Sequence, residues 1–399
     1  MEHGKGKSSR RFFTATAVTA AAATRVAGAS DRIRIGVIGA GGRGWGHIRD
    51  FSHLPDTEVV AVCDVYRTKA QRACAKQNVS PFITQDHRRV LERKDIDAVV
   101  IATCDHSHVP LLLDALEAGK DVYVEKPLTF RMADGARVAE AVRRTRRVVQ
   151  VGTQQRSGRR ILEAKERFID SGVIGKVSLV RTWWLGNLGY RIPVPQDFVY
   201  DPADLDWNRF LGPAPRRPFD AQRYFAWYNW SDYSTGQPGG LMVHTLDVVR
   251  TMLGLNAPAS VVASGGNYEF PNDRDMPDTI SILAEYPQKV MVTFDATLST
   301  PRRYVDVEFH GSKGVLNIFR ERYVFRPADP GAPAVEVKGE DCVPPHLRNF
   351  LNAMRSRKQP NSDVVYSHYL AAVCHMANMS CQTGKRVNWN REWDVPSLA

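Results

Sequence analysis

The feature that most constrains this fold is a short β-branched run that leads directly into a cluster of glycines. Residues 33–38 predict a strand, and Gly39, Gly41 and Gly44 follow it with the spacing GxGxxG. In this pattern the first glycine makes a tight turn, the second lets the backbone approach a pyrophosphate, and the third lets strand and helix pack closely. The next residues, 45–51, can begin a helix whose N-terminus offers free N–H groups to phosphate.

The segment after the glycine turn is informative, because a lone GxGxxG is weak evidence. A second predicted strand, 57–63, ends at Asp64, about where the ribose-binding acid of a dinucleotide site is expected. Asp64 would accept hydrogen bonds from both ribose hydroxyls and repel a 2′-phosphate, which favours NAD over NADP. Arg67 lies close enough to soften that preference, so NADP stays open, and Asp64 has the alternative role of a helix cap. Gly42 and Arg43, inside the turn, are further expected cofactor contacts.

Strands and helices continue to alternate after this unit, with short connections between them. The predicted elements are, in order, 96–103, 109–118, 121–125, 132–144 and 148–153. This alternation predicts a parallel, doubly wound sheet, and ligands bind such sheets beyond the carboxyl ends of the strands. Polar residues cluster at three of those ends. From these clusters we expect cofactor contacts by Thr103, His106, His108, Glu125, Lys126 and Gln154.

The length of the chain predicts more than one domain, since 399 residues are too many for one core of ordinary size. We expect a leader over 1–30, a dinucleotide-binding Rossmann domain over 31–153, and a substrate-binding and oligomerisation domain over 154–399. The last of these contains β-rich segments at 260–265, 279–285, 289–297, 305–310 and 315–319. The predicted fold is therefore α/β, a doubly wound parallel sheet joined to an α+β domain with a large, mainly antiparallel sheet. A last helix, near His346, is expected to return toward the first domain.

The first 30 residues differ from the rest and predict a targeting segment. Residues 9–13 resemble the twin-arginine export motif, a weakly hydrophobic stretch follows at 14–24, and 27–29 offer a small-residue cleavage site. The alternative is a disordered basic tail. We therefore expect a protein that is exported in folded form, to the periplasm or beyond, and that cannot draw on a soluble nicotinamide pool.

Charge and composition exclude several classes of partner. The formal net charge is +11, but basic residues are dispersed among acidic ones and cluster only at 143–147, which we interpret as a solvated helix end. A nucleic-acid interface needs such residues gathered on one face, so no nucleic acid is expected. No apolar run reaches the roughly 18 residues of a membrane span. The six cysteines lack zinc spacing, and His106 and His108 lack a third nearby ligand, so no metal is expected either.

The sequence from about Arg32 onward resembles the glucose-fructose oxidoreductase / inositol dehydrogenase / rhizopine catabolism family, Gfo/Idh/MocA. The most diagnostic residues are Glu125-Lys126-Pro127, which accompany the glycine turn and the run 102–108. Further similar positions are Trp207, 211–215, His244, Asp247, His346, 348–350 and 355–357. The resemblance implies an NAD(P)-dependent oxidoreductase that acts on a sugar, cyclitol or sugar derivative with a tightly held cofactor. It also implies a homodimer or homotetramer formed through the C-terminal sheet.

Hydride transfer needs a group that takes the hydroxyl proton, and Lys126 is the first candidate. Pro127 restricts the lysine backbone to extended conformations, which suits a fixed side chain at a strand end. In the family this lysine contacts the substrate hydroxyl and the cofactor, and the bond between the two residues is often cis. The alternative is a surface lysine in a turn.

His244 is the second catalytic candidate, because its ordinary pKa suits proton transfer at neutral pH and the family uses this histidine as a proton acceptor or relay. The alternative is a buried structural histidine. The family often has an aspartate four residues earlier, but here that position is Gly240. Lys126 would then carry more of the proton transfer, and Asp232 or Asp247 remain candidates to orient His244.

The segment 183–233 is dense in aromatic residues with interleaved arginines, a composition that suits sugar binding but also builds cores. We predict that Tyr190, Arg191 and Tyr233 lie nearest the substrate. Arg156, together with Lys126 and His244, completes the predicted substrate contacts.

The sequence is compatible with three functions. The first is a dehydrogenase whose bound cofactor a second substrate reoxidises in place. The second is a glycosidase or lyase that oxidises a sugar transiently, eliminates, and reduces it again. The third is a non-catalytic sugar- or cofactor-binding protein, which the missing acid at Gly240 keeps open while Lys126 and His244 oppose it.

Overall fold

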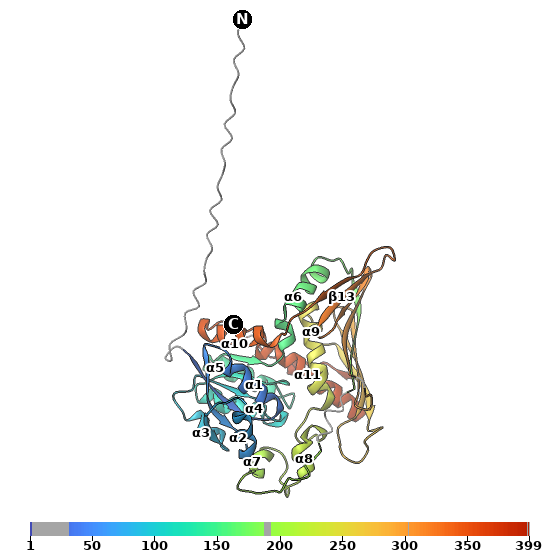
Figure 1. Ribbon diagram of the computed structural model, residues 1–399. Helices are drawn as coiled ribbons and strands as arrows, with labels where there is room; N and C mark the ends of the chain where they lie inside the picture. Colours follow the sequence, from blue (N-terminus) through green and yellow to red (C-terminus); the bar gives the residue numbers. More distant parts are fainter. Residues whose placement is uncertain (2–31, 187–192, 302, 397, 399) are drawn as a thin grey trace.

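The computed structural model describes the whole chain except residues 2–31, 187–192, 302, 397 and 399. The predicted leader therefore lies outside the described residues, as do Tyr190 and Arg191. The described part contains two β-sheets, each with helices packed against it (Figure 1). All six cysteines are free thiols. Among the described helices, we find none that combines the length and the apolar character needed to cross a bilayer.

The first sheet has six parallel strands in the order β3-β2-β1-β4-β5-β6. Its strands are β1 (Ile33–Ile38), β2 (Thr57–Cys63), β3 (Phe82–Thr84), β4 (Ala98–Ile101), β5 (Asp121–Val124) and β6 (Val149–Val151). Its helices are α1 (Gly42–Ser52), α2 (Arg67–Ala75), α3 (His87–Leu91), α4 (His108–Glu117) and α5 (Asp134–Thr145). Apolar clusters cover both faces of the sheet, which is why its strands are nearly continuous runs of buried residues. The predicted doubly wound sheet is confirmed. The order reverses between β1 and β4, so a ligand site is expected at this switch point.

The short strand β3 is the element of this sheet that the sequence did not predict. It has three residues and its first side chain, Phe82, is exposed, so it carries no run of buried residues that periodicity could detect. Its pairing with β2 comes from tertiary packing rather than from local pattern.

The second sheet has nine strands in the order β14-β13-β12-β11-β7-β10-β9-β8-β15. They are β7 (Val177–Leu185), β8 (Ser260–Gly266), β9 (Thr279–Tyr286), β10 (Val290–Thr297), β11 (Tyr304–Gly311), β12 (Gly314–Ile318), β13 (Arg322–Pro327), β14 (Val335–Lys338) and β15 (Val387–Asn388). All neighbouring pairs are antiparallel except β7 and β10. This confirms the mainly antiparallel sheet that the sequence predicted.

Helices cover one face of the second sheet: α6 (Arg159–Ala164), α9 (Val243–Leu253) and α11 (Val364–Thr383) (Figure 1). The strands β9 and β10 alternate between buried and more exposed side chains, as expected when one face packs on a core and the other does not. No element of the described part covers that second face.

The helix α10 (Val343–Ser356) belongs to the core of the first sheet although it lies near the end of the chain. Its residues Leu347, Phe350 and Leu351 are buried in one cluster with residues of β1 and β5. Bidentate ion pairs also hold this segment against the first domain, since Arg348 binds Asp56 and Arg357 binds Asp121. The helix α11 then runs from the first sheet along the second, so the end of the chain joins the two parts.

Candidate active site

The glycine turn at the end of β1 has the geometry that a pyrophosphate needs. Gly39 has φ +94°, a left-handed conformation, and a Cβ there would lie 2.5 Å from the carbonyl oxygen of Ala102. A Cβ on Gly44 would lie 1.8 Å from the Gly39 oxygen, so only glycine lets α1 pack this closely on the strand. At Gly41 and Gly42 a Cβ would meet nothing within 4 Å. The open side of the turn, at the start of α1, therefore fits the phosphates of a dinucleotide.

Asp64 joins this turn to the end of β2. Its Oδ2 accepts a hydrogen bond from the Ala40 N–H at 2.7 Å, and its Oδ1 accepts one from the Tyr66 N–H at 2.9 Å. The helix α2 begins after Tyr66 and has no side-chain cap, so Asp64 orders the turn before the helix and does not cap it. Arg67 is held by Gln85, because its Nη2 donates to the Gln85 side chain at 3.1 Å.

A cavity of about 860 Å³ opens beside this turn, within the range of small-molecule sites. The first domain contributes the strand ends: Gly39, Gly41, Gly42, Arg43, Asp64, Thr103 and His106 are among the lining residues. The helix α7 (Trp207–Leu211) and the loop after it close the opposite side with Asn208, Phe210, Gly212, Pro213 and Arg216. The predicted motif at 211–215 therefore acts as a wall of the cavity.

The two histidines of the predicted cluster have different positions. His106 lies in the cavity wall, and its Nε2 is 2.9 Å from the Phe210 oxygen, which joins the first domain to α7. Burial lowers the pKa of His106. His108 is buried behind the wall, with Nδ1 2.8 Å from the Pro127 oxygen. It therefore supports the turn that carries Lys126.

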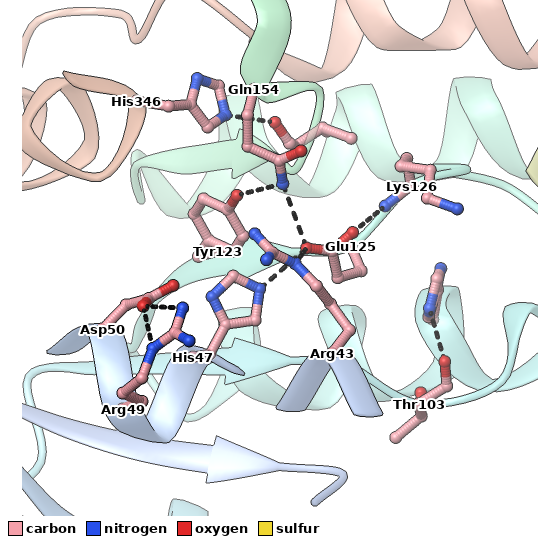
Figure 2. Close-up of polar contacts among 12 residues, drawn as sticks. Arg43, His47, Arg49, Asp50, Thr103, Tyr123, Glu125, Lys126, Gln154 and His346 are labelled. Atoms are coloured by element: carbon pink, nitrogen blue, oxygen red, sulfur yellow. Dashed lines mark hydrogen bonds and ion pairs between the residues drawn. The ribbon is translucent and has the colours of Figure 1, made fainter. Parts of the chain in front are cut away.

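Glu125 is the centre of a buried polar cluster at the end of β5 (Figure 2). Its Oε1 accepts hydrogen bonds from Arg43 Nε and His47 Nε2, each at 2.8 Å, and from Gln154 Nε2 at 3.3 Å. Burial opposes the charge of this carboxylate, but the Arg43 guanidinium and the His47 hydrogen bond hold the pKa of Glu125 well below its usual range. The cluster fixes an ionised acid behind the glycine turn, and its cofactor contacts stay a prediction.

Sequence reasoning missed His47 and the Tyr123 hydroxyl, to which Gln154 donates at 3.0 Å. Burial and the neighbouring Arg43 lower the pKa of His47, so its neutral ring donates from Nε2 to Glu125. One signal was available, because His47 follows Arg43 by one helical turn and must lie on the same face of α1.

Lys126 connects the two parts of the molecule. The peptide bond between Lys126 and Pro127 is cis, as the resemblance implied. The lysine side chain leaves the Glu125 cluster (Figure 2), and its Nζ donates to the Gly240 oxygen at 3.1 Å. No acid of the described residues forms an ion pair with it. Two of its three N–H bonds therefore remain for a ligand.

His244 lies in the first turn of α9, directly after the segment Pro238–Met242 that receives Lys126. Burial, and then the charge of Lys126, hold the pKa of His244 well below its usual value. A neutral imidazole at this place can accept a proton. Its ring lies 5.6 Å from the ring of Trp184 on β7.

The two acids considered as partners of His244 both bind arginines. Asp232 contacts Arg217 at 2.6 Å and Arg223 at 2.9 Å. Asp247 lies 3.7 Å from Arg156, and burial raises the pKa of Asp247 to about 6. Within the described residues, neither acid has a hydrogen bond to His244.

Gly240 has no room for the acid that the family often carries there. A Cβ at this position would lie 2.0 Å from the hydroxyl oxygen of Tyr228. That hydroxyl donates to the Gly236 oxygen at 2.8 Å, which holds the ring in place. The space of the missing acid is therefore filled by a neutral phenol.

The remaining predicted substrate contacts do not meet at one place. Arg156 stacks on the Tyr366 ring, with Cζ 3.6 Å from the ring centroid, at the junction with α11. Tyr233 is fully buried among the aromatic residues around α7, and its ring lies 5.3 Å from that of His106. Both substrate contacts stay predictions, as do those of Tyr190 and Arg191.

This geometry agrees with the comparison to protein families. Residues 33–153 match the family described as "Oxidoreductase family, NAD-binding Rossmann fold", and residues 208–317 match the "GFO/IDH/MocA C-terminal domain". The chain therefore belongs to the Gfo/Idh/MocA family of oxidoreductases. The cofactor of its Rossmann domain is NAD.

Individual relatives match mainly over the first domain. An inositol 2-dehydrogenase of Gluconacetobacter diazotrophicus is 38% identical over 148 residues, which are 37% of this chain and 44% of that protein. A glycosyl hydrolase family 109 protein of Shewanella putrefaciens is 34% identical over 155 residues, 37% of this chain and 34% of that protein. These alignments span less than half of either relative. A levoglucosan dehydrogenase solved with NADH and levoglucosan has the same fold, with a TM-score of 0.71 at 18% identity over 90% of this chain and 99% of that one.

Proposed function

We propose that this protein is an NAD-dependent oxidoreductase that transfers a hydride between the cofactor and a CH–OH group of a sugar, cyclitol or sugar derivative. The observation that carries the proposal is the contact between Lys126 and Gly240. It brings Lys126, which pairs with no acid of the described residues, from the end of β5 to the helix turn that carries a neutral His244. These are the two groups that oxidation of an alcohol requires, one to hold the hydroxyl and one to take its proton.

The residues of the chain divide this work. Lys126 donates a hydrogen bond to the substrate hydroxyl and orients its carbon, and His244 accepts the hydroxyl proton as the hydride leaves. The cluster of Arg43, His47 and Glu125 fixes the backbone of Lys126, whose N–H lies 3.3 Å from Glu125 Oε2. NAD, when bound along the glycine turn, supplies the hydride acceptor.

We further propose export by the twin-arginine route, with a cofactor that stays bound and is reoxidised by a second substrate. The leader-like segment at 1–30 and the missing nicotinamide pool outside the cytoplasm support this. A second copy of the chain is the proposed occupant of the uncovered face of the second sheet, which gives a dimer or tetramer. Sequencing of the mature N-terminus and light scattering of the purified protein test these two points.

The experiment for the activity uses the protein as purified and then with added NAD. A panel of sugars, cyclitols and glycosides is mixed with it, the absorbance of NADH is followed, and nucleotide released on denaturation is identified. Formation of NADH with one substrate class supports the dehydrogenase. Turnover of a glycoside without net NADH would favour transient redox chemistry; one relative over the first domain is named a glycosyl hydrolase family 109 protein.

Lys126→Ala separates the enzymatic functions from a binding protein. A catalyst loses its turnover with this variant, whereas a sensor keeps its response to the ligand. Lys94→Ala is the matched control, because Lys94 is an exposed lysine of the same domain.

A further inference from the structure

We propose that the substrate carries an oxyanion group, which Arg320 and Arg303 bind beside the indole of Trp184. The group is a carboxylate, sulfate or phosphate on a sugar or cyclitol. This inference rests on the proposed function and narrows its substrate class.

The strand register brings both arginines to the face of the second sheet that α9 covers. Trp184 of β7 pairs with Val305 of β11, and Val307 pairs with Ile318 of β12. Arg303 lies just before β11, and Arg320 lies two residues after the end of β12, so both are at the strand ends next to Trp184. Their guanidinium carbons lie 5.0 Å and 5.8 Å from the Trp184 ring centroid.

His244 lies against the same indole, since the two rings are 5.6 Å apart. Trp184 is therefore a shared neighbour of the predicted proton acceptor and the two arginines. A sugar whose reacting hydroxyl contacts Lys126 and His244 would extend along this ring, and a substituent on it would reach the guanidinium groups.

Among the described residues that act on His244, cations outnumber acids. Lys126 and Arg320 both act on His244, and each lowers its pKa. The acid that acts on it in the opposite direction is Glu125, which already binds Arg43 and His47. In the part of the chain that the structure describes, neither Lys126 nor Arg320 forms an ion pair. Cations that converge without acids produce a positive potential, and a bound anion is its natural complement.

The turn that carries Arg320 is held by a buried arginine. Arg160 is 3% exposed, and its Nε donates to the Phe319 oxygen at 3.2 Å. Its Nη1 donates to the Glu340 oxygen at 3.4 Å. Among the described residues no acid pairs with Arg160, so it serves as a positioning residue that fixes the backbone just before Arg320. A fixed guanidinium loses less freedom when it binds an oxyanion.

The test compares matched pairs of ligands on the NAD-loaded protein. The pairs are glucose with glucuronate, galactose with galacturonate, and glucose with its 6-sulfate and 6-phosphate; myo-inositol is a further neutral probe. Rates of NADH formation give kcat/KM, and titration of the NADH complex gives Kd for the same compounds. We expect one anionic member to exceed its neutral partner by about tenfold or more, mainly through KM. The sulfate, phosphate and carboxylate arms identify the oxyanion.

Arg320→Gln should remove most of that preference, measured as the ratio of kcat/KM for the anionic member to kcat/KM for its neutral partner, and Arg320→Lys should restore part of it. Arg322→Gln is the matched control, because Arg322 lies two residues away and pairs with Glu336 at the surface. NADH binding and the melting temperature show that each variant is folded. Neutral substrates that react as well as their acids in the wild type would overturn the inference and leave the proposed function intact. Tight binding of an acid without any NADH formation would support the inference and contradict the proposed function. Neither binding nor turnover of any acid would overturn the inference.

Discussion

The two sides of Lys126 differ in how their charges are compensated. On one side, Glu125 is buried and accepts hydrogen bonds from Arg43 and His47. On the other side, Arg320 lies near Trp184 without an ion pair among the described residues. A charged group whose partners are all within the protein is fixed in position, whereas a cation that lacks such a partner attracts an anionic ligand. We therefore expect substitutions on the first side to change stability and those on the second to change recognition.

The largest effect is expected at the boundary of the two sides. Lys126→Met should lower kcat/KM by about 10²–10⁴, because it removes the donor that holds the substrate hydroxyl for proton transfer to His244, while NAD affinity stays similar. Steady-state kinetics and NADH titration measure the two quantities. A variant that loses NAD binding together with activity would show that Lys126 belongs to the compensated side.

Glu125→Gln should lower the free energy of unfolding by about 1–3 kcal/mol, because it removes the buried charged acceptor of the hydrogen bonds from Arg43 and His47. Denaturant titration measures the loss. Arg320→Gln is the contrasting variant, and its change should stay within about 0.5 kcal/mol. Equal losses at both positions would remove the distinction between the two sides.

Asp247 allows a pH test of an incompletely compensated acid. Its pKa is raised from 3.8 to about 6 by burial, so the folded protein holds a proton that the unfolded chain releases. The contribution of this group to stability is therefore complete below about pH 3.8 and is lost as the pH rises to about 6. Asp247→Asn should gain stability relative to the wild type over that window, by about 3 kcal/mol at most. The free energy of unfolding is measured at pH 4 and pH 6.5 for the wild type and for Asp247→Asn. An equal change with pH in the two proteins would contradict this prediction.

The smallest effect is expected at Arg67. Its guanidinium binds Gln85 and is not part of the cavity wall. Arg67→Gln should therefore change the ratio of NAD to NADP affinity by less than about threefold, a change that corresponds to roughly half the free energy of one charge-assisted hydrogen bond. Titration with both reduced cofactors measures the ratio. A larger drop in NADP binding would place Arg67 among the cofactor contacts.

The parts that the sequence predicted are those in which a local pattern dictates the chemistry. The glycine turn, Asp64 and the cis turn at Lys126 each occupy a few consecutive residues, and their requirements are steric. The Glu125 cluster was predicted only in part, because His47 contacts Glu125 only when α1 and β5 pack side by side. Trp184 and Arg320 were also beyond reach, since the register of strands far apart in sequence brings them together. Tyr233 shows why composition alone is ambiguous. In a segment rich in aromatic residues, the same residue types build the core and contact ligands.

The position of α10 sets the order in which this protein can mature. Leu347, Phe350 and Leu351 complete the core of a sheet whose first strand begins at Ile33. The ribosome must therefore synthesise more than three hundred further residues before that first strand is fully covered. Until then the N-terminal half exposes an apolar face and needs protection from aggregation. The core of the dinucleotide-binding sheet is consequently complete only once α10 has been synthesised.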